Sequence, residues 1–382
     1  MNKRFTLDGD AGLESHLAQT CAGVANGVRT LVPPERLEAV VLGGGYGRGE
    51  GGVLHTRKGD QPYNDLEFYV FLRGSRLANE RRYREQLRQL GEDLSAGAGL
   101  HVEFKTDSLE RLRRSPVSMF TYDLVSGHRI VHGSPGCFAG CAHHFKAGDI
   151  PLSEATRLLF NRCTGLLLVK DLLRRPLLKP EESDFIGRNL AKAQLALGDA
   201  LLAALGLYHW SCRERHVHLT TLDETDFPGA LDTVRKHHAA GVEFKLHPRR
   251  TLGSAAEFAK QHTELASLCL RLWLWVESRR LGCSFESPWD YAFSPVRKCP
   301  ETPGWRNYCL NLRTFGARAA WDTMSTRYPR ERLFNALALL LWSADGSQPT
   351  ETRQKLRSCL QTDAADWSGL VEAYKEVWPV YG

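Results

Sequence analysis

The sequence lacks any apolar run long enough to cross a lipid bilayer. Its longest runs cover only residues 165–169 and 336–342, whereas a membrane-spanning helix needs about 20 predominantly apolar residues. The residues that follow Met1 are polar and lack the apolar core of a secretory signal. We therefore expect a cytoplasmic protein that makes no contact with a membrane.

The sequence also lacks the cysteine spacing of a disulfide framework. Its 10 cysteines are dispersed, which favours reduced thiols. One short segment gathers four potential zinc ligands: Cys137, Cys141, His143 and His144. Their spacing is irregular and no second Cys/His pair lies nearby in the sequence. An inter-domain loop with incidental Cys and His residues is therefore favoured over a zinc site.

The charge of the chain is not biased strongly enough to indicate a nucleic-acid partner. The formal net charge is +6, and the paired arginines are scattered along the chain. Solvated helix faces account for most such pairs, and a basic groove for phosphate or RNA is the alternative. Charge alone therefore does not identify a nucleic-acid-binding protein.

Residues 1–148 carry the pattern of a small α/β domain. Apolar residues at helical spacing predict a helix over residues 11–32 and another that contains Tyr83 and Leu94. Four further segments predict strands: 37–42, 65–72, 100–105 and 127–133. Residues 55–62 are interpreted as an inserted hairpin or loop. This order of helices and strands predicts a mixed sheet.

Helical periodicity dominates the rest of the chain, residues 149–382, where no convincing strand pattern occurs. The predicted helices cover residues 152–173, 187–207, 228–240, 254–281, 311–325, 330–343, 350–361 and 366–377. The expected fold class is therefore α+β, with a small mixed-sheet domain at 1–148 and an all-helical bundle at 149–382.

A glycine-rich segment, residues 43–52, follows the first predicted strand, and two acids open the next one. Glycines let backbone N–H groups approach phosphate oxygens closely. Asp65 and Glu67 alternate along one strand, so their side chains share a face with Cα atoms about 6–7 Å apart. Carboxylates are the hard oxygen ligands that Mg²⁺ requires, and two of them can share a pair of ions about 3.5–4 Å apart.

A third acid, Glu103, has the correct phase on its own strand to join this face. It would bind the catalytic metal and help to deprotonate an attacking group. The alternative is that all three acids form the solvated side of a half-exposed sheet. A dinucleotide-binding interpretation of the glycines is weak, because Gly49, Gly51 and Gly52 interrupt the helix that it requires.

These residues resemble the signature of a known superfamily. Gly44-Gly45 with Arg48-Gly49-Glu50, followed by Asn64-Asp65-Leu66-Glu67, is similar to that of the nucleotidyltransferases typified by DNA polymerase beta and the aminoglycoside nucleotidyltransferases. The resemblance covers about residues 37–135, with an all-helical partner domain behind. It implies that Gly44 and Gly45 contact a nucleoside triphosphate. It also implies that Asp65 and Glu67 bind metal and that Glu103 is the third acid.

The chain departs from the signature at three points. Gly45 stands where many members have serine, so a hydroxyl contact to phosphate is missing. The interval between the glycines and Asp65 is longer than usual. The second metal ligand is Glu67 rather than the commoner aspartate. These departures motivate the alternative of a fold that binds nucleotide without turnover.

Three basic residues are further candidates for triphosphate contact. Arg48 could instead form a local ion pair with Glu50. Lys105 could instead form a salt bridge to one of the acids. Lys192, on a predicted helix that also carries Asn189 and Asp199, is suggested by the helical lysines of partner domains in the superfamily. Its alternative is a surface lysine.

Two other patterns lie in the helical half. Residues 244–248 form a second candidate for phosphate contact. Arg213 and His218 match a loose pattern of helical ribonuclease domains, one that arises often by chance. Neither pattern identifies a substrate.

The resemblance implies a Mg²⁺-dependent nucleotidyltransferase with two ions. It would transfer a nucleoside monophosphate from a triphosphate, with ATP expected, to an acceptor hydroxyl and release pyrophosphate. The nucleotide would bind between the two domains. The acceptor, whether small molecule, protein or RNA, and the oligomeric state are not defined by the sequence. The alternative is a catalytically inactive nucleotide-binding module that acts as a sensor or antitoxin.

Overall fold

The computed structural model of the chain describes residues 4–227, 229–250, 253–343 and 349–382. Helices and a small mixed sheet make up an α+β protein, as expected, and every strand of the described residues lies before residue 134. No helix within these ranges is both long and apolar enough to cross a bilayer.

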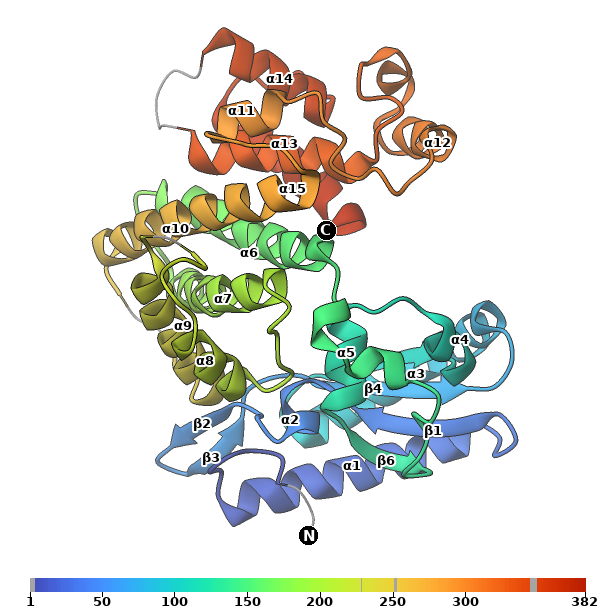
Figure 1. The fold of residues 1–382 in the computed structure, drawn as a ribbon. Coiled ribbons are helices and arrows are strands. Elements are labelled where there is room, and N and C mark those ends of the chain that lie inside the picture. The colour runs from blue at the N-terminus through green and yellow to red at the C-terminus, as the bar shows by residue number, and fades with distance from the viewer. Residues whose placement is uncertain (1–3, 228, 251–252, 344–348) are drawn as a thin grey trace. The chain divides into compact units, whose positions relative to one another are not determined.

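The chain forms two compact units (Figure 1). The first unit comprises Met1–Glu154, Leu202–Phe227 and His238–Arg249. The second comprises Ala155–Leu201, Pro228–His237 and Arg250–Gly382. The first unit thus contains two segments from the second half of the sequence, and the expected boundary between residues 148 and 149 stays a prediction.

A four-stranded mixed sheet organises the first unit, with the strand order β5-β4-β1-β6. Its strands are β1 (Leu37–Leu42), β4 (Leu66–Leu72), β5 (Val102–Asp107) and β6 (Arg129–Gly133). β1 pairs antiparallel with both β4 and β6, whereas β4 and β5 are parallel. The expected insertion is a separate hairpin of β2 (Val53–Thr56) and β3 (Gly59–Pro62).

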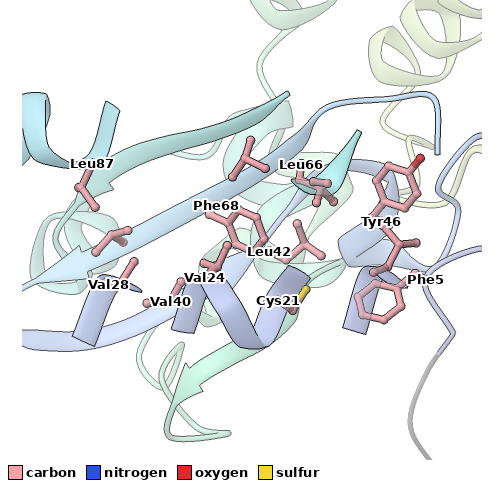
Figure 2. Close-up of a cluster of buried hydrophobic side chains, with 14 of the residues drawn as sticks. Phe5, Cys21, Val24, Val28, Val40, Leu42, Tyr46, Leu66, Phe68 and Leu87 are labelled. Atoms are coloured by element: carbon pink, nitrogen blue, oxygen red, sulfur yellow. The ribbon is translucent and has the colours of Figure 1, made fainter. Parts of the chain in front are cut away.

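Two long helices, α1 (Ala11–Leu31) and α3 (Arg76–Ala98), pack on one face of this sheet. Asp10 caps α1 by accepting a hydrogen bond from the Leu13 amide. Figure 2 shows how the apolar stripe of α1 meets alternate residues of β1 and β4. Leu66, Phe68, Val70 and Leu72 occupy alternate positions of β4, so this one set of side chains enters the core.

The opposite face is covered by two short helices, α4 (Leu109–Arg114) and α5 (Met119–Ser126), which the sequence pattern did not predict. Each is shorter than the span needed for helical periodicity to become recognisable. Phe71 of β4 packs edge-on against Phe138 in this second core. The two central strands, β1 and β4, are thus buried over most of their length, with Glu67 half-buried, whereas β5 and β6 are mostly half-buried.

The predicted Cys/His cluster contributes to packing in the same region. Cys137 and Cys141 are buried in the second core. His144 Nε2 lies 2.9 Å from the Leu112 carbonyl oxygen, and His143 Nε2 lies 3.1 Å from that of Ser115. The two rings thus contact backbone oxygens, and the four side chains do not form a metal-binding group among the described residues.

The remaining helices are α6 Leu152–Leu173, α7 Pro180–Ala204, α8 Cys212–Thr220, α9 Leu231–Leu246, α10 Ala255–Leu281, α11 Pro288–Phe293, α12 Gly304–Phe315, α13 Pro329–Trp342, α14 Thr350–Leu360 and α15 Trp367–Tyr381. Most coincide with the predicted helices, although α8 and α11 were not predicted. Residue 228, where the helix 228–240 was expected to begin, lies outside the described residues. The prediction of one helix over 311–325 is wrong, because α12 ends at Gly316, whose φ is +75°, and a 3₁₀ helix (Ala317–Trp321) follows.

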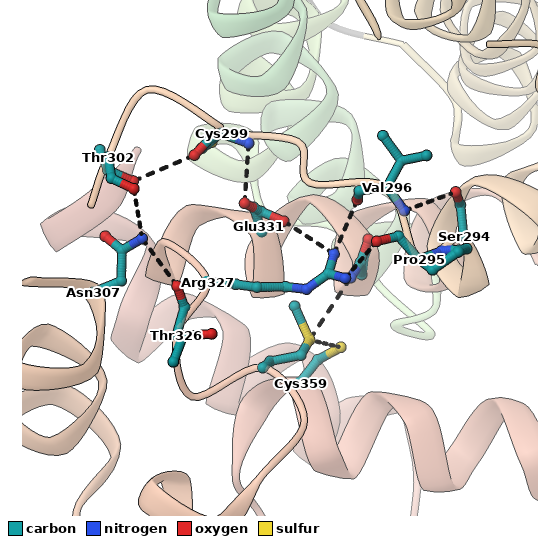
Figure 3. A network of polar contacts seen from close by, with 12 residues as sticks. Ser294, Pro295, Val296, Cys299, Thr302, Asn307, Thr326, Arg327, Glu331 and Cys359 are labelled. Atoms are coloured by element: carbon teal, nitrogen blue, oxygen red, sulfur yellow. Dashed lines mark hydrogen bonds and ion pairs between the residues drawn. The ribbon is translucent and has the colours of Figure 1, made fainter. Parts of the chain in front are cut away.

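A buried polar network connects the loop after α11 with α13 in the second unit (Figure 3). One carboxylate oxygen of Glu331 accepts the Cys299 amide at 3.0 Å, and the other lies 3.4 Å from Arg327 Nη1. Arg327 also donates to the Val296 carbonyl at 2.9 Å. Glu331 is therefore a buried charge with hydrogen-bond donors on both oxygens, as burial of a carboxylate requires.

Candidate functional site

The glycine segment forms a compact turn directly after β1. Here the structure corrects an expectation, because a five-residue helix, α2 (Gly44–Arg48), does follow the first glycines. It ends at Gly49, which adopts the left-handed conformation with φ of +83°. The dinucleotide-binding interpretation still does not fit, because β1 pairs antiparallel with the next sheet strand rather than parallel.

Gly45 has a steric reason for being glycine. A Cβ atom there would lie 2.9 Å from the Glu50 carbonyl oxygen, closer than such atoms approach in proteins. The serine found in many nucleotidyltransferases would force this turn to open. The departure at Gly45 therefore follows from the tight return of the chain at Glu50.

Tyr46 fixes the turn to the segment that leads into β4. Its side chain is 1% exposed, and its hydroxyl donates to the Gly52 carbonyl at 2.8 Å and accepts from the Tyr63 amide at 2.9 Å. Burial raises the pKa of this hydroxyl to about 12, so it stays protonated and able to donate. The glycine turn and the start of the acidic strand are therefore held in a fixed relation.

Glu67 and Glu103 are direct partners in the register of the parallel strands β4 and β5. Their side chains therefore leave the sheet on the same face. The Gly43 amide donates to the Glu67 carbonyl at 2.9 Å, which brings the turn to this end of β4. Gly44 has no side chain, and a Cβ there would lie 3.8 Å from Glu67 Oε2. Asp65 precedes β4 by one residue and is exposed.

Two of the three acids are engaged by neighbours. Glu67 Oε2 accepts from the Tyr69 hydroxyl at 3.0 Å, and burial together with Glu67 raises the pKa of Tyr69. Lys105 Nζ lies 3.1 Å from Glu103 Oε2, so the salt-bridge alternative for Lys105 is observed. The two glutamates are each neutralised or hydrogen-bonded by a residue of their own strand.

The structure does not bring the three carboxylates to one point. Among the described residues, one group of three acidic, His or Cys side chains has ligand atoms all within 4.8 Å of one another, and Asp65, Glu67 and Glu103 are not that group. Carboxylates without a bound cation repel one another, and Glu67 and Glu103 contact Tyr69 and Lys105 instead. The donor set still suits Mg²⁺, because all its atoms are hard oxygens and Gly44 leaves space beside Glu67.

Arg48 and Glu50 do not form the local ion pair that was one alternative. Arg48 Nη1 lies 2.8 Å from Asp123 Oδ2, and Tyr208 donates to the same oxygen at 3.3 Å. Burial disfavours the charged guanidinium and would lower the pKa of Arg48. The neighbouring Asp123 carboxylate outweighs burial, so the pKa of Arg48 is raised. Arg48 is therefore committed to a structural pair, and its direct contact with phosphate stays a prediction.

Glu50 makes a long-range contact instead. Its carboxylate accepts from the Ser211 hydroxyl and, at 3.0 Å, from the Cys212 amide, at the start of α8. Burial would raise the pKa of Glu50, but these hydrogen bonds outweigh burial and lower it. Asp123, Tyr208, Ser211 and Cys212 thus support the glycine turn. The sequence marks Tyr208 and Ser211 only as polar residues after a helix, without any signal that links them to Glu50.

No protein-family model matches this chain, and no curated protein matches its sequence.

The other candidate residues lie outside this turn in the sequence. Residues 244–248 come close to it, since a Cβ at Gly52 would be 3.0 Å from the Lys245 carbonyl oxygen. Lys192 is exposed on α7 in the second unit, and its contact with a triphosphate stays a prediction. Arg213 and His218 both lie on α8, five residues apart. A helix turns about 100° per residue, so their side chains point about 140° apart. His218 Nδ1 also lies 2.8 Å from the Leu207 carbonyl oxygen, so nothing here favours a ribonuclease pair.

Proposed function

We propose that this protein is a Mg²⁺-dependent nucleotidyltransferase that transfers a nucleoside monophosphate to an acceptor hydroxyl and releases pyrophosphate. One observation carries the proposal: Glu67 and Glu103 occupy paired positions on parallel strands, beside a glycine turn whose amide bonds to the backbone of Glu67. A half-exposed sheet without function has no need for a tight glycine turn at the same strand end.

Each residue has a distinct role in this proposal. Asp65 and Glu67 would hold the metal, and Glu103 would hold it and accept the proton of the acceptor hydroxyl. The backbone amides of Gly44 and Gly45 would orient the triphosphate, since no side chain blocks their approach. Lys105 would move from Glu103 to a phosphate oxygen. When bound, Mg²⁺ neutralises the charge that develops on the phosphate oxygens.

The test is a nucleotidyl-transfer assay with labelled triphosphates, Mg²⁺ and a panel of acceptors. We expect Glu67→Gln and Glu103→Gln each to lower turnover by at least about 100-fold, the scale of a lost electrostatic or general-base contribution. Glu110→Gln is the matched control, because Glu110 is an exposed glutamate of the same unit. Transfer by Glu67→Gln at the rate of the unchanged protein would refute the proposal.

A second function on the same fold is a nucleotide-binding module without turnover. The separation of the three carboxylates and the steric exclusion of serine at Gly45 favour it. Equilibrium binding of a labelled triphosphate separates the two functions. Tight binding with no pyrophosphate release over the whole acceptor panel supports the module and contradicts the enzyme.

A further inference from the structure

Three segments that are distant in the sequence bring potential metal ligands together in the first unit. Asp8 comes from the loop before α1, His55 from β2 and His247 from the residues just after α9. One ligand atom of each lies within 4.8 Å of the other two. His247 Nε2 lies 2.9 Å from Asp8 Oδ2, and the two imidazole rings stack at 5.7 Å between centroids.

Each histidine is oriented by a carboxylate on its other ring nitrogen. Asp60 Oδ1 lies 2.7 Å from His55 Nδ1, and Glu243 Oε1 lies 3.2 Å from His247 Nδ1. A carboxylate that accepts Nδ1–H fixes the tautomer in which Nε2 carries a free lone pair. His55 therefore has the arrangement of a metal-binding imidazole. His247 Nε2 faces Asp8 Oδ2 at 2.9 Å, so an ion bound between these two atoms would take the place of the proton they share.

The loop and hairpin that carry these residues are themselves fixed. Asp60 Oδ2 accepts the Asp10 amide at 2.8 Å, and Asp10 Oδ2 accepts the Asp60 amide at 3.1 Å. The Glu14 carboxylate accepts the amides of Phe5 and Thr6, just before Asp8. Because these ligands are already held in place, less conformational entropy is lost when an ion binds.

We propose that Asp8, His55 and His247 form a binding site for Zn²⁺. The ligands would be one Asp8 carboxylate oxygen and Nε2 of each histidine, with water in the fourth position. Imidazole nitrogens select zinc-like transition metals over Mg²⁺, so this site differs in chemistry from the all-oxygen set at Glu67. All three side chains reach solvent, so an ion can enter without unfolding.

The ion would act as a cross-link within the first unit. It would connect the N-terminal loop, the β2–β3 hairpin and the end of α9, which otherwise contact here through polar side chains. Because Zn²⁺ would bind only the folded form, the thermal midpoint of unfolding should rise with the logarithm of the free metal concentration. This site is separate from the proposed transfer reaction, so its test does not depend on nucleotide.

The test uses the untagged full chain after chelator treatment, titrated with Zn²⁺ by calorimetry and with Co²⁺ by visible absorption. We expect one ion per chain, intense cobalt bands typical of a tetrahedral site, and binding that persists in millimolar Mg²⁺. His55→Ala and His247→Ala should abolish the bands. Glu243→Gln should weaken binding by about 10–100-fold, because it removes a supporting carboxylate while leaving the ligands.

His101→Ala is the matched control, because His101 is an exposed histidine of the same unit outside the cluster. It should bind Zn²⁺ as the unchanged protein does. Far-UV circular dichroism identifies any variant that fails to fold, and His55→Asn then replaces it. Absence of Zn²⁺ binding, or equal binding by the His101, His55 and His247 variants, overturns the proposal.

Discussion

Replacing Lys298 by methionine should stabilise the second unit at neutral pH. Lys298 is 1% exposed, and its Nζ atom has no hydrogen-bond partner among the described residues. The Tyr291 ring, 4.6 Å from Nζ, attracts the cation. Methionine has a similar length and flexibility without the charge, so it can fill the same space.

The magnitude follows from the pKa of the buried amine. Burial, with Arg327, lowers the pKa of Lys298 from 10.5 to about 8, although Glu331 opposes the change. One pKa unit corresponds to 1.36 kcal/mol, so the lowered pKa destabilises the folded protein by roughly 3 kcal/mol at a pH where Lys298 is charged in both the folded and the unfolded state. The attraction to Tyr291 is worth roughly 1 kcal/mol. We therefore expect Lys298→Met to be more stable by about 2 kcal/mol at pH 7.

The pH dependence has a definite sign. Between pH 8 and 10.5 the unfolded chain keeps the proton that the folded protein has lost, so the unchanged protein gains stability as the pH rises. The advantage of Lys298→Met should shrink over this window. Urea unfolding at pH 7, 8, 9 and 10 measures the difference in stability between the variant and the unchanged protein. Lys375→Met is the control, because Lys375 is an exposed lysine on α15. A variant that is less stable at pH 7, or an advantage that is constant with pH, would refute the reasoning.

Three further predictions concern the glycine turn. Tyr46→Phe should destabilise the first unit by about 1–3 kcal/mol in urea unfolding, because the Gly52 carbonyl and the Tyr63 amide lose their buried partner. Gly45→Ser should cost about 1–3 kcal/mol and lower nucleotide affinity in equilibrium binding, because its Cβ would overlap the Glu50 carbonyl. A gain of affinity would contradict this. The lowered pKa of Glu50 makes its contribution to stability present above about pH 4.5 and lost as the pH falls through the folded value. Glu50→Gln should therefore flatten the acid side of the stability profile measured by urea unfolding, and an unchanged acid profile would count against it.

Periodic patterns predicted the large elements of this fold. The apolar stripe of α1 and the alternation in β4 each engage a core, so tertiary packing and local pattern agree. The same alternation placed Glu67 and Glu103 in phase, and the strand register brings them side by side. Metal binding by Glu67 and Glu103 stays a prediction.

Contacts between distant segments could not be predicted in this way. Arg48 pairs with Asp123, 75 residues away, and Glu50 with Ser211, 161 residues away. A single sequence carries no periodic signal for such pairs, because each partner is compatible with its local structure alone. The short helices α4 and α5 were missed for the complementary reason that they contain too few turns to show a period.

The hydrogen bonds of Glu50 with Ser211 and Cys212 have a consequence for synthesis of the chain. The chain emerges from the ribosome from its N-terminus, so the sheet can form while the partners of Glu50 are still untranslated. Until α8 appears, Glu50 lacks the donors that compensate its burial, and the glycine turn lacks that support. The turn should therefore reach its final form late, after the strands on either side of it.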